Sequence, residues 1–214
     1  MNFFGHAAIA GRFEPHPAFV LGAMLPDFCG MLGLRVPEPE QGERAAGLRF
    51  HHVTDHAFHE LGRFRTLYRD ATALLDARGV LRGTARAVAH VGVELLLDAE
   101  LAESDEARAV YLAALEAGRE PALLRDTPFG PGEREQLGRL AGTLADRGVA
   151  KRPSTDLVVA RLERALAGRA RLAIRSHDVP FVSEWVELFR ERVVASAPAL
   201  VSELTSEIER RLAA

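Results

Sequence analysis

Residues 85–97 read ARAVAHVGVELLL. The polar side chains in this stretch are Arg86, His90 and Glu94, which recur at every fourth position. On an α-helix, a step of four residues is about 6 Å of rise and about 40° of rotation, so the three would line one face. The apolar residues around them favour a buried helix, which we expect to run from about Gly83 to Ala102.

The rest of the chain has the same helical character. Ala, Leu, Arg and Glu are abundant, whereas alternating β-branched runs bounded by turn residues are missing. The sequence therefore predicts an all-α protein. A length of 214 residues favours a single-domain helical bundle over 1–214. We divide it into a metal-site half, 1–104, and a helical scaffold half, 105–214.

Turn residues and apolar spacing give approximate helix boundaries. Besides 83–102, we expect helices over 2–10, 17–26, 105–117, 132–146, 154–166, 180–195 and 197–212. A further helix should start at about Glu43 and contain residues 51–59, and a bend at Gly62 should precede another that ends near Asp76. Pro26 should kink or end the second helix, and Asp178 should cap the helix that starts at 180. Segments 33–42 and 121–132 are expected to be surface connections. The apolar stripe within 182–189, which includes the single Trp, is expected to be core.

Composition excludes several classes of function. Lys and Arg total 27 against 30 Asp and Glu, a net charge of −3, so no excess of basic residues favours nucleic-acid binding. Cys29 is the single cysteine, which rules out an intramolecular disulfide. The N-terminus lacks the charged region of a signal peptide, and no uncharged apolar run reaches the roughly 20 residues of a membrane span. We expect a cytoplasmic protein without a membrane span.

A first stripe of metal-ligand residue types comprises His51, Asp55 and His59, spaced by four. His52 and His56 form a second pair, rotated by about 100°. His51 and Asp55 are the preferred ligands, because an imidazole and a carboxylate one turn apart can hold one transition metal. His59 lies about 12 Å along the axis from His51 and would serve a second ion or the substrate. The alternative is a solvated polar face.

A second stripe comprises His90, Glu94 and Asp98 on the helix quoted above. Buried carboxylates carry a desolvation cost of several kcal/mol unless a cation compensates them, and a metal ion is a suitable cation. The alternative is an internal salt-bridge network that includes Arg86. The planar guanidinium of Arg86 would instead suit a substrate phosphate.

Several short motifs occur in an order that resembles the acyl carrier protein phosphodiesterase family. They are MNFFGH at 1–6, LGAMLPDF at 21–28, GLRFH at 47–51, Asp55 four residues further on, and the acid pair Glu94 and Asp98. The resemblance covers about residues 1–104. It implies a helical, HD-domain-like fold and a divalent metal, typically manganese. It also implies cleavage of the phosphopantetheine arm from the serine of acyl carrier protein.

The resemblance also implies a set of metal ligands. Carried over by position, they are His6, Asp27, His51, Asp55, Glu94 and Asp98. Taken alone, His6 and Asp27 would be read as a core polar group or a helix cap. The chain departs from the family pattern at His52, His59, Glu94 and Ala99. The segment at 21–27 with downstream histidines is also loosely similar to zinc-dependent phospholipase C proteins.

These patterns predict metal-assisted hydrolysis of a phosphoester. The ligand set is compatible with manganese, iron or zinc, and the resemblance implies manganese. The bound metal would polarise the phosphoryl group and lower the pKa of a bound water. Histidines not used as ligands, His52, His56 or His59, would move protons. Arg49 or Arg86 would hold the phosphate oxygens. The alternative function is a non-catalytic helical metal-binding or interaction protein.

Overall fold

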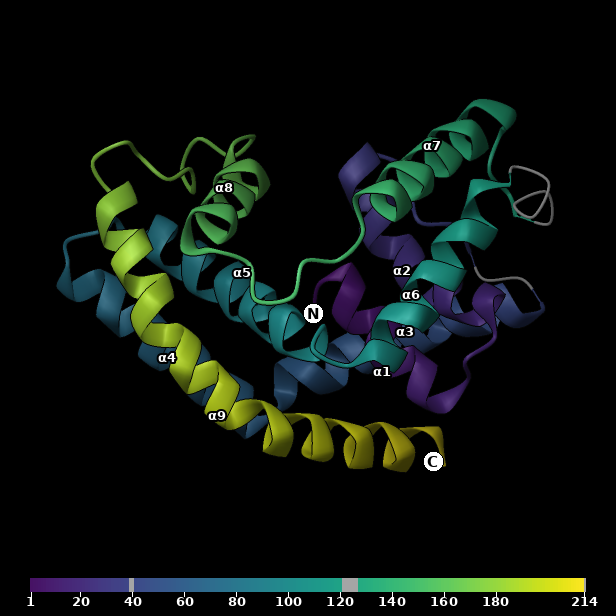
Figure 1. Ribbon diagram of the computed structural model, residues 1–214, viewed down its shortest axis with the longest axis horizontal. Coiled ribbons are helices and arrows are strands. Elements are labelled where there is room, and N and C mark those ends of the chain that lie inside the picture. The colour runs from purple at the N-terminus through teal and green to yellow at the C-terminus, as the bar shows by residue number, and fades with distance from the viewer. Residues whose placement is uncertain (39–40, 121–126, 214) are drawn as a thin grey trace. The chain divides into compact units, whose positions relative to one another are not determined.

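The structure of the protein is a computed structural model that describes residues 1–38, 41–120 and 127–213 (Figure 1). Within these ranges the regular elements are all α-helices, which confirms the predicted fold class. In chain order they are α1 (Phe3–Phe13), α2 (Pro17–Leu32), α3 (Glu43–Glu60), α4 (Gly62–Ala77), α5 (Arg82–Leu101), α6 (Asp105–Arg119), α7 (Pro131–Arg147), α8 (Thr155–Leu166) and α9 (Val179–Leu212).

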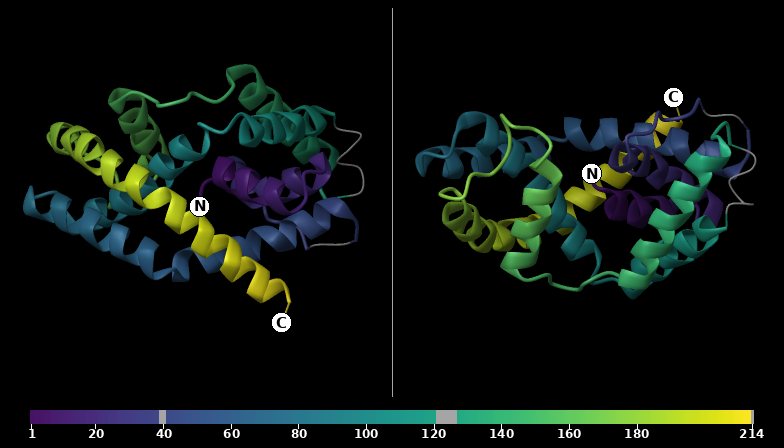
Figure 2. Two further views of the ribbon diagram at one scale, coloured as in Figure 1. Left: turned by 60° about the horizontal axis from the view of Figure 1, so that its bottom comes forward. Right: turned by 90° about the horizontal axis from the view of Figure 1, so that it is seen from above.

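Two helices of the structure continue through a proline. Helix α2 continues past Pro26, and α9 passes through Pro198 as one continuous ribbon instead of the two expected helices (Figure 2). A proline removes one backbone hydrogen bond, and buried apolar residues on both sides of each proline outweigh that loss. The expected connection at 33–42 is non-helical where described. Residues 121–126 of the other expected connection lie outside the described residues.

The start of α9 partly differs from the prediction. Asp178 occupies the cap position, but its side chain makes no capping hydrogen bond, because its backbone is already helical (φ −84°, ψ −22°). The apolar stripe that follows is buried as predicted. Within it, the rings of Trp185 and Phe189 stack with centroids 5.4 Å apart.

Contacts between helices divide the chain into two compact units. The first unit comprises Met1–His56 and Leu101–Ala150, and the second comprises Ala57–Glu100 and Lys151–Ala214. Each unit combines a segment from the N-terminal half with one from the C-terminal half. The division therefore differs from the boundary that we expected at residue 104, because helices distant in sequence pack together.

In the first unit, two glycines allow α3 to lie directly on the backbone of α2. A Cβ atom on Gly47 would lie 1.9 Å from the carbonyl oxygen of Phe19, and one on Gly22 would lie 2.1 Å from that of Arg44. Only a residue without a Cβ permits this approach. The contact brings α3, with its histidines, against α2. Helices α1, α2, α6 and α7 form the rest of the packing in this unit.

Replacing Gly47 with alanine is expected to destabilise the protein by about 3 kcal/mol, because the new methyl group must push α3 away from α2. Urea denaturation of the purified variant measures this loss. Gly30→Ala is the matched control, since Gly30 is exposed on α2 with open space around it. Alanine there should raise stability by about 0.5–1 kcal/mol. Equal stability of the two variants would contradict the close-approach explanation.

In the second unit, α9 lies alongside α4, and α8 packs on α9 (Figures 1 and 2). Helix α5 contacts α9 through Gly92, where an added Cβ would lie 2.4 Å from the indole of Trp185. Gly92 lies between His90 and Glu94 in sequence. The core contact with Trp185 therefore fixes the stretch of α5 that carries the second polar stripe.

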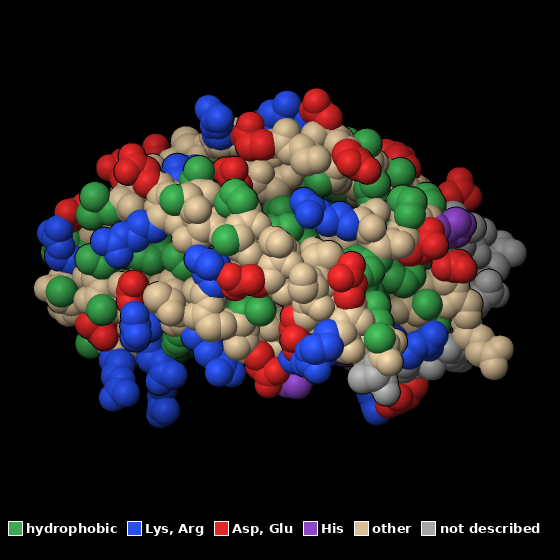
Figure 3. Space-filling model, turned by 90° about the horizontal axis from the view of Figure 1, so that it is seen from below, with side chains coloured by type: hydrophobic (Ala, Val, Ile, Leu, Met, Phe, Trp, Pro, Cys, Tyr) green, Lys and Arg blue, Asp and Glu red, His purple; other side chains and the backbone are tan. Residues whose placement is uncertain are grey.

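The surface carries charges of both signs. On the face drawn in Figure 3, Lys and Arg side chains are interspersed with Asp and Glu side chains. Among the described residues, no helix has both the length and the apolar character needed to cross a membrane.

Candidate metal centres

The structure gathers six of the predicted residues into two clusters, each contained within one unit. The first-unit cluster consists of His6, Asp27 and His51, and the second-unit cluster consists of His59, His90 and Glu94. In each cluster, every residue offers one nitrogen or carboxylate oxygen, and these atoms lie within 4.8 Å of one another. Imidazole nitrogens and carboxylate oxygens are common ligands of divalent metals in proteins.

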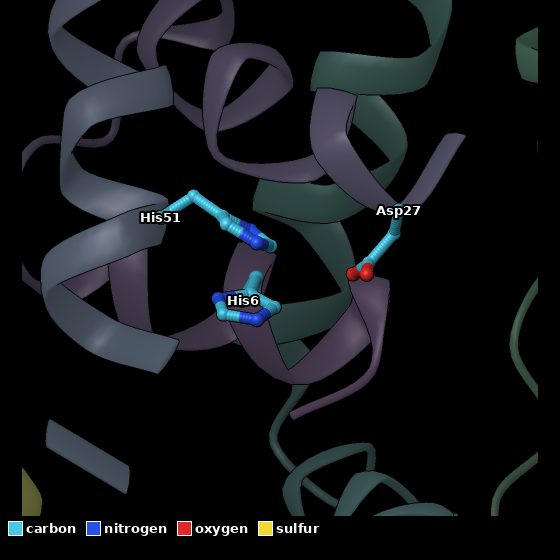
Figure 4. A group of neighbouring side chains, drawn as sticks. All are labelled: His6, Asp27 and His51. Carbon is cyan, nitrogen blue, oxygen red and sulfur yellow. The ribbon is translucent and has the colours of Figure 1, made fainter. Parts of the chain in front are cut away.

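Three helices build the first-unit cluster. His6 comes from α1, Asp27 from α2 and His51 from α3, and their side chains point toward one another (Figure 4). His6 is fully buried and His51 is 7% exposed, whereas Asp27 is partly exposed. The two imidazole rings lie with their centroids 3.9 Å apart. The cluster is thus deep on its histidine side and reachable from solvent at Asp27.

The hydrogen bonding of His51 leaves one defined nitrogen for a ligand. Its Nδ1 lies 2.8 Å from the carbonyl oxygen of Ala23 on α2. A carbonyl only accepts hydrogen bonds, so Nδ1 donates and, in the neutral ring, Nε2 carries the lone pair. Burial lowers the pKa of His51 to about 4, which keeps the ring neutral near pH 7. Metal-binding histidines commonly have this arrangement, with the second nitrogen held by a backbone carbonyl.

His6 has the least satisfied side chain of the cluster. Within the described residues, neither of its ring nitrogens has a hydrogen-bond partner. Its Nε2 lies 3.7 Å from Oδ1 of Asp55, beyond hydrogen-bonding distance. Burial lowers the pKa of His6 to about 3, so the ring is neutral. An unsatisfied buried polar group costs about 1–3 kcal/mol, and a bound cation would supply the missing partner.

Asp55 lies next to the first-unit cluster. Its Oδ1 is 3.7 Å from the His6 ring and 3.1 Å from the amino nitrogen of Met1, and its side chain is 41% exposed. We expected Asp55 to pair with His51 because they are one turn apart on α3. In the structure, the side chains grouped with His51 come from α1 and α2.

The second-unit cluster joins the end of α3 to the middle of α5. His59 Nε2 lies 3.1 Å from His90 Nε2 and 3.3 Å from Glu94 Oε1, and His90 Nε2 lies 3.1 Å from the same oxygen. Burial raises the pKa of Glu94, but hydrogen bonds from the two histidines contribute to lowering it below its usual range. Glu94 is therefore a charged carboxylate near pH 7.

Aromatic side chains hold the two histidine rings of this cluster. The rings are nearly parallel, with centroids 4.9 Å apart. Phe64 on α4 meets both rings edge-on, and Tyr68, one turn later, meets His90 in the same way. Phe64 and Tyr68 were not among the predicted site residues, because nothing in the spacing of α4 shows that it packs beside these histidines.

Three of the residues predicted on α3 for proton transfer and phosphate binding are exposed. His52 and His56 lie at the surface, as does Arg49. The ring of His52 meets that of His51 edge-on, with centroids 5.5 Å apart. None of the three belongs to the clustered ligand atoms found among the described residues.

Of the other two residues predicted on α5, Arg86 is exposed and Asp98 is buried. The exposure of Arg86 differs from the buried stretch that we expected, and the Arg86 Nε donates a hydrogen bond to the Tyr68 hydroxyl at 3.0 Å. Asp98 is buried one turn after Glu94. Glu94 itself pairs with two histidines.

Comparison of the chain with protein-family models, curated proteins and solved structures finds no match in any of the three. Each cluster is therefore characterised by its own chemistry. Each is a group of imidazole and carboxylate side chains within one unit that could hold a divalent metal ion.

Proposed function

We propose that the protein is a divalent-metal-dependent phosphoester hydrolase whose metal centre is the first-unit cluster. The observation that carries the proposal is the fully buried His6, whose ring nitrogens have no hydrogen-bond partner among the described residues. It lies against His51, whose Nε2 lone pair is left available, and near the carboxylate of Asp27. Two neutral imidazoles and a carboxylate fit a divalent ion and leave coordination positions open.

The bound ion would polarise the phosphoryl group and lower the pKa of a water molecule. His6, Asp27 and His51 would hold it.

The partly exposed carboxylate of Asp55 lies 3.7 Å from His6 and would accept the proton of the attacking water. Arg49, exposed two residues before His51, would bind phosphate oxygens. His52 and His56, on the surface of the same helix, would carry protons to solvent.

The nitrogen and oxygen donor set is compatible with manganese, iron and zinc. We place manganese first on the resemblance to acyl carrier protein phosphodiesterases alone, since a donor set with two imidazoles by itself favours a later ion such as zinc. For the same reason, the phosphopantetheine arm of acyl carrier protein is the first substrate to assay. Simple phosphodiesters form the second group to assay.

Elemental analysis and a hydrolysis screen test the proposal. We expect the purified protein to bind Mn²⁺ and to hydrolyse either phosphopantetheinylated carrier protein or a chromogenic phosphodiester. The His51→Ala variant should lose first-unit metal and at least about 99% of the hydrolysis, because a ligand is removed. His177→Ala is the matched control, since His177 is exposed in the second unit.

The outcomes separate the two classes of function. If the protein binds metal in a way that depends on His51 but hydrolyses none of the phosphoesters tested, it is a non-catalytic metal-binding protein. If His51→Ala leaves both metal content and hydrolysis unchanged, the first-unit cluster is not the metal centre.

A further inference from the structure

The second-unit cluster has the dimensions of a metal coordination triangle. Its three atoms, Nε2 of His59, Nε2 of His90 and Oε1 of Glu94, are separated by 3.1, 3.1 and 3.3 Å. Ligand atoms bound at 2.0–2.1 Å lie about 3.0 Å apart at adjacent octahedral positions and about 3.4 Å apart in a tetrahedron. The observed separations fall between these two geometries.

Hydrogen bonds alone cannot satisfy all three edges of this triangle. If both histidine Nε2 atoms donate to Glu94, the two N–H groups face each other at 3.1 Å. If one Nε2 donates to the other, the accepting nitrogen turns its lone pair toward the carboxylate oxygen of Glu94. One edge is therefore repulsive in either state. A cation bonded to all three atoms removes the conflict.

The cluster is held in place and open on one side. Glu94 and His90 are one turn apart on α5, and the edges of Phe64 and Tyr68 hold the imidazole rings. The side chains of His59 and His90 are 30% and 40% exposed, whereas that of Glu94 is 10% exposed. An ion bound there would keep positions for water or for an exogenous ligand.

We propose that His59, His90 and Glu94 form a second metal site, separate from the proposed hydrolytic centre, that binds a late first-row dication of the Zn²⁺ class. Two imidazoles favour such an ion over Mn²⁺, which prefers oxygen ligands. Only atoms of the second unit are involved. The inference therefore stands or falls independently of the proposed function.

Calorimetric titration of Zn²⁺ into full-length, chelator-treated protein tests this site. We expect a Zn²⁺ binding event that His90→Ala and Glu94→Gln each weaken roughly 100-fold and that Mn²⁺ competes for poorly. His51→Ala and the exposed-histidine control His177→Ala should keep it. Loss of the event in His51→Ala, with His90→Ala unaffected, would assign the binding to the first-unit cluster and overturn the proposal.

A measurement on the unmodified protein covers the case of variants that fold poorly. The NMR signals of the His59 and His90 rings should shift together as Zn²⁺ is added. Signals from these rings that remain unchanged at saturating Zn²⁺ would overturn the proposal, whatever the state of the variants.

Discussion

Acidifying the metal-free protein from pH 7 to pH 4 is expected to remove several kcal/mol of folding free energy. The cause is the pair of buried neutral imidazoles, since burial lowers the pKa of His6 to about 3 and that of His51 to about 4. In the unfolded chain, histidine titrates near 6.5. Between pH 6.5 and these lowered values the unfolded state binds more protons, so stability falls as the pH falls.

The size of the effect is the slope of the free energy of unfolding against pH. Each histidine contributes up to about 1.4 kcal/mol per pH unit, and the contribution is fully present only above pH 6.5. Urea denaturation at a series of pH values measures the slope. The His51→Gln variant should lose the part of this slope that one titrating histidine contributes. The Phe50→Leu variant, a destabilising change at the neighbouring buried position, should keep the full slope. An unchanged slope in His51→Gln would show that His51 is not a buried neutral group.

Substituting Asp27 with asparagine is expected to lower metal-dependent hydrolysis by a factor of roughly 100 or more. Asparagine keeps the shape of the side chain but removes the negative charge of the first-unit cluster. Its amide oxygen is a weaker ligand for a divalent ion than a carboxylate. The rate at saturating substrate, measured over a range of Mn²⁺ concentrations, reports the effect. Part of the loss should be recovered at high Mn²⁺.

The matched control is Asp146→Asn in the same unit. Asp146 is exposed and forms a surface ion pair with Arg119. Such pairs contribute little, so this variant should retain wild-type stability within about 1 kcal/mol and wild-type hydrolysis. If Asp27→Asn matched this control at every Mn²⁺ concentration, Asp27 would not be a ligand.

Helix positions were predictable because the signals that determine them are local. The spacing of Arg86, His90 and Glu94 predicted α5 to within one residue at each end. Ser154, the predicted first residue of α8, is its N-cap, and the helix begins at the next residue. Two predicted boundaries differ from the structure, since α2 continues past Pro26 and α9 is one helix where we expected a break at 195–197. At Pro26 and Pro198, one lost hydrogen bond is outweighed by burial of neighbouring side chains, which depends on the tertiary structure.

The sequence by itself determined which faces of α3 and α5 carry metal-ligand residue types, since helix geometry alone places residues four apart on one face. Only the tertiary structure decided which residues share a cluster. His51 meets His6 and Asp27 because α3 approaches α2 at Gly22 and Gly47. His59 joins His90 and Glu94 within the second unit. Spacing along one helix defines a face, and the packing of other helices determines what that face meets.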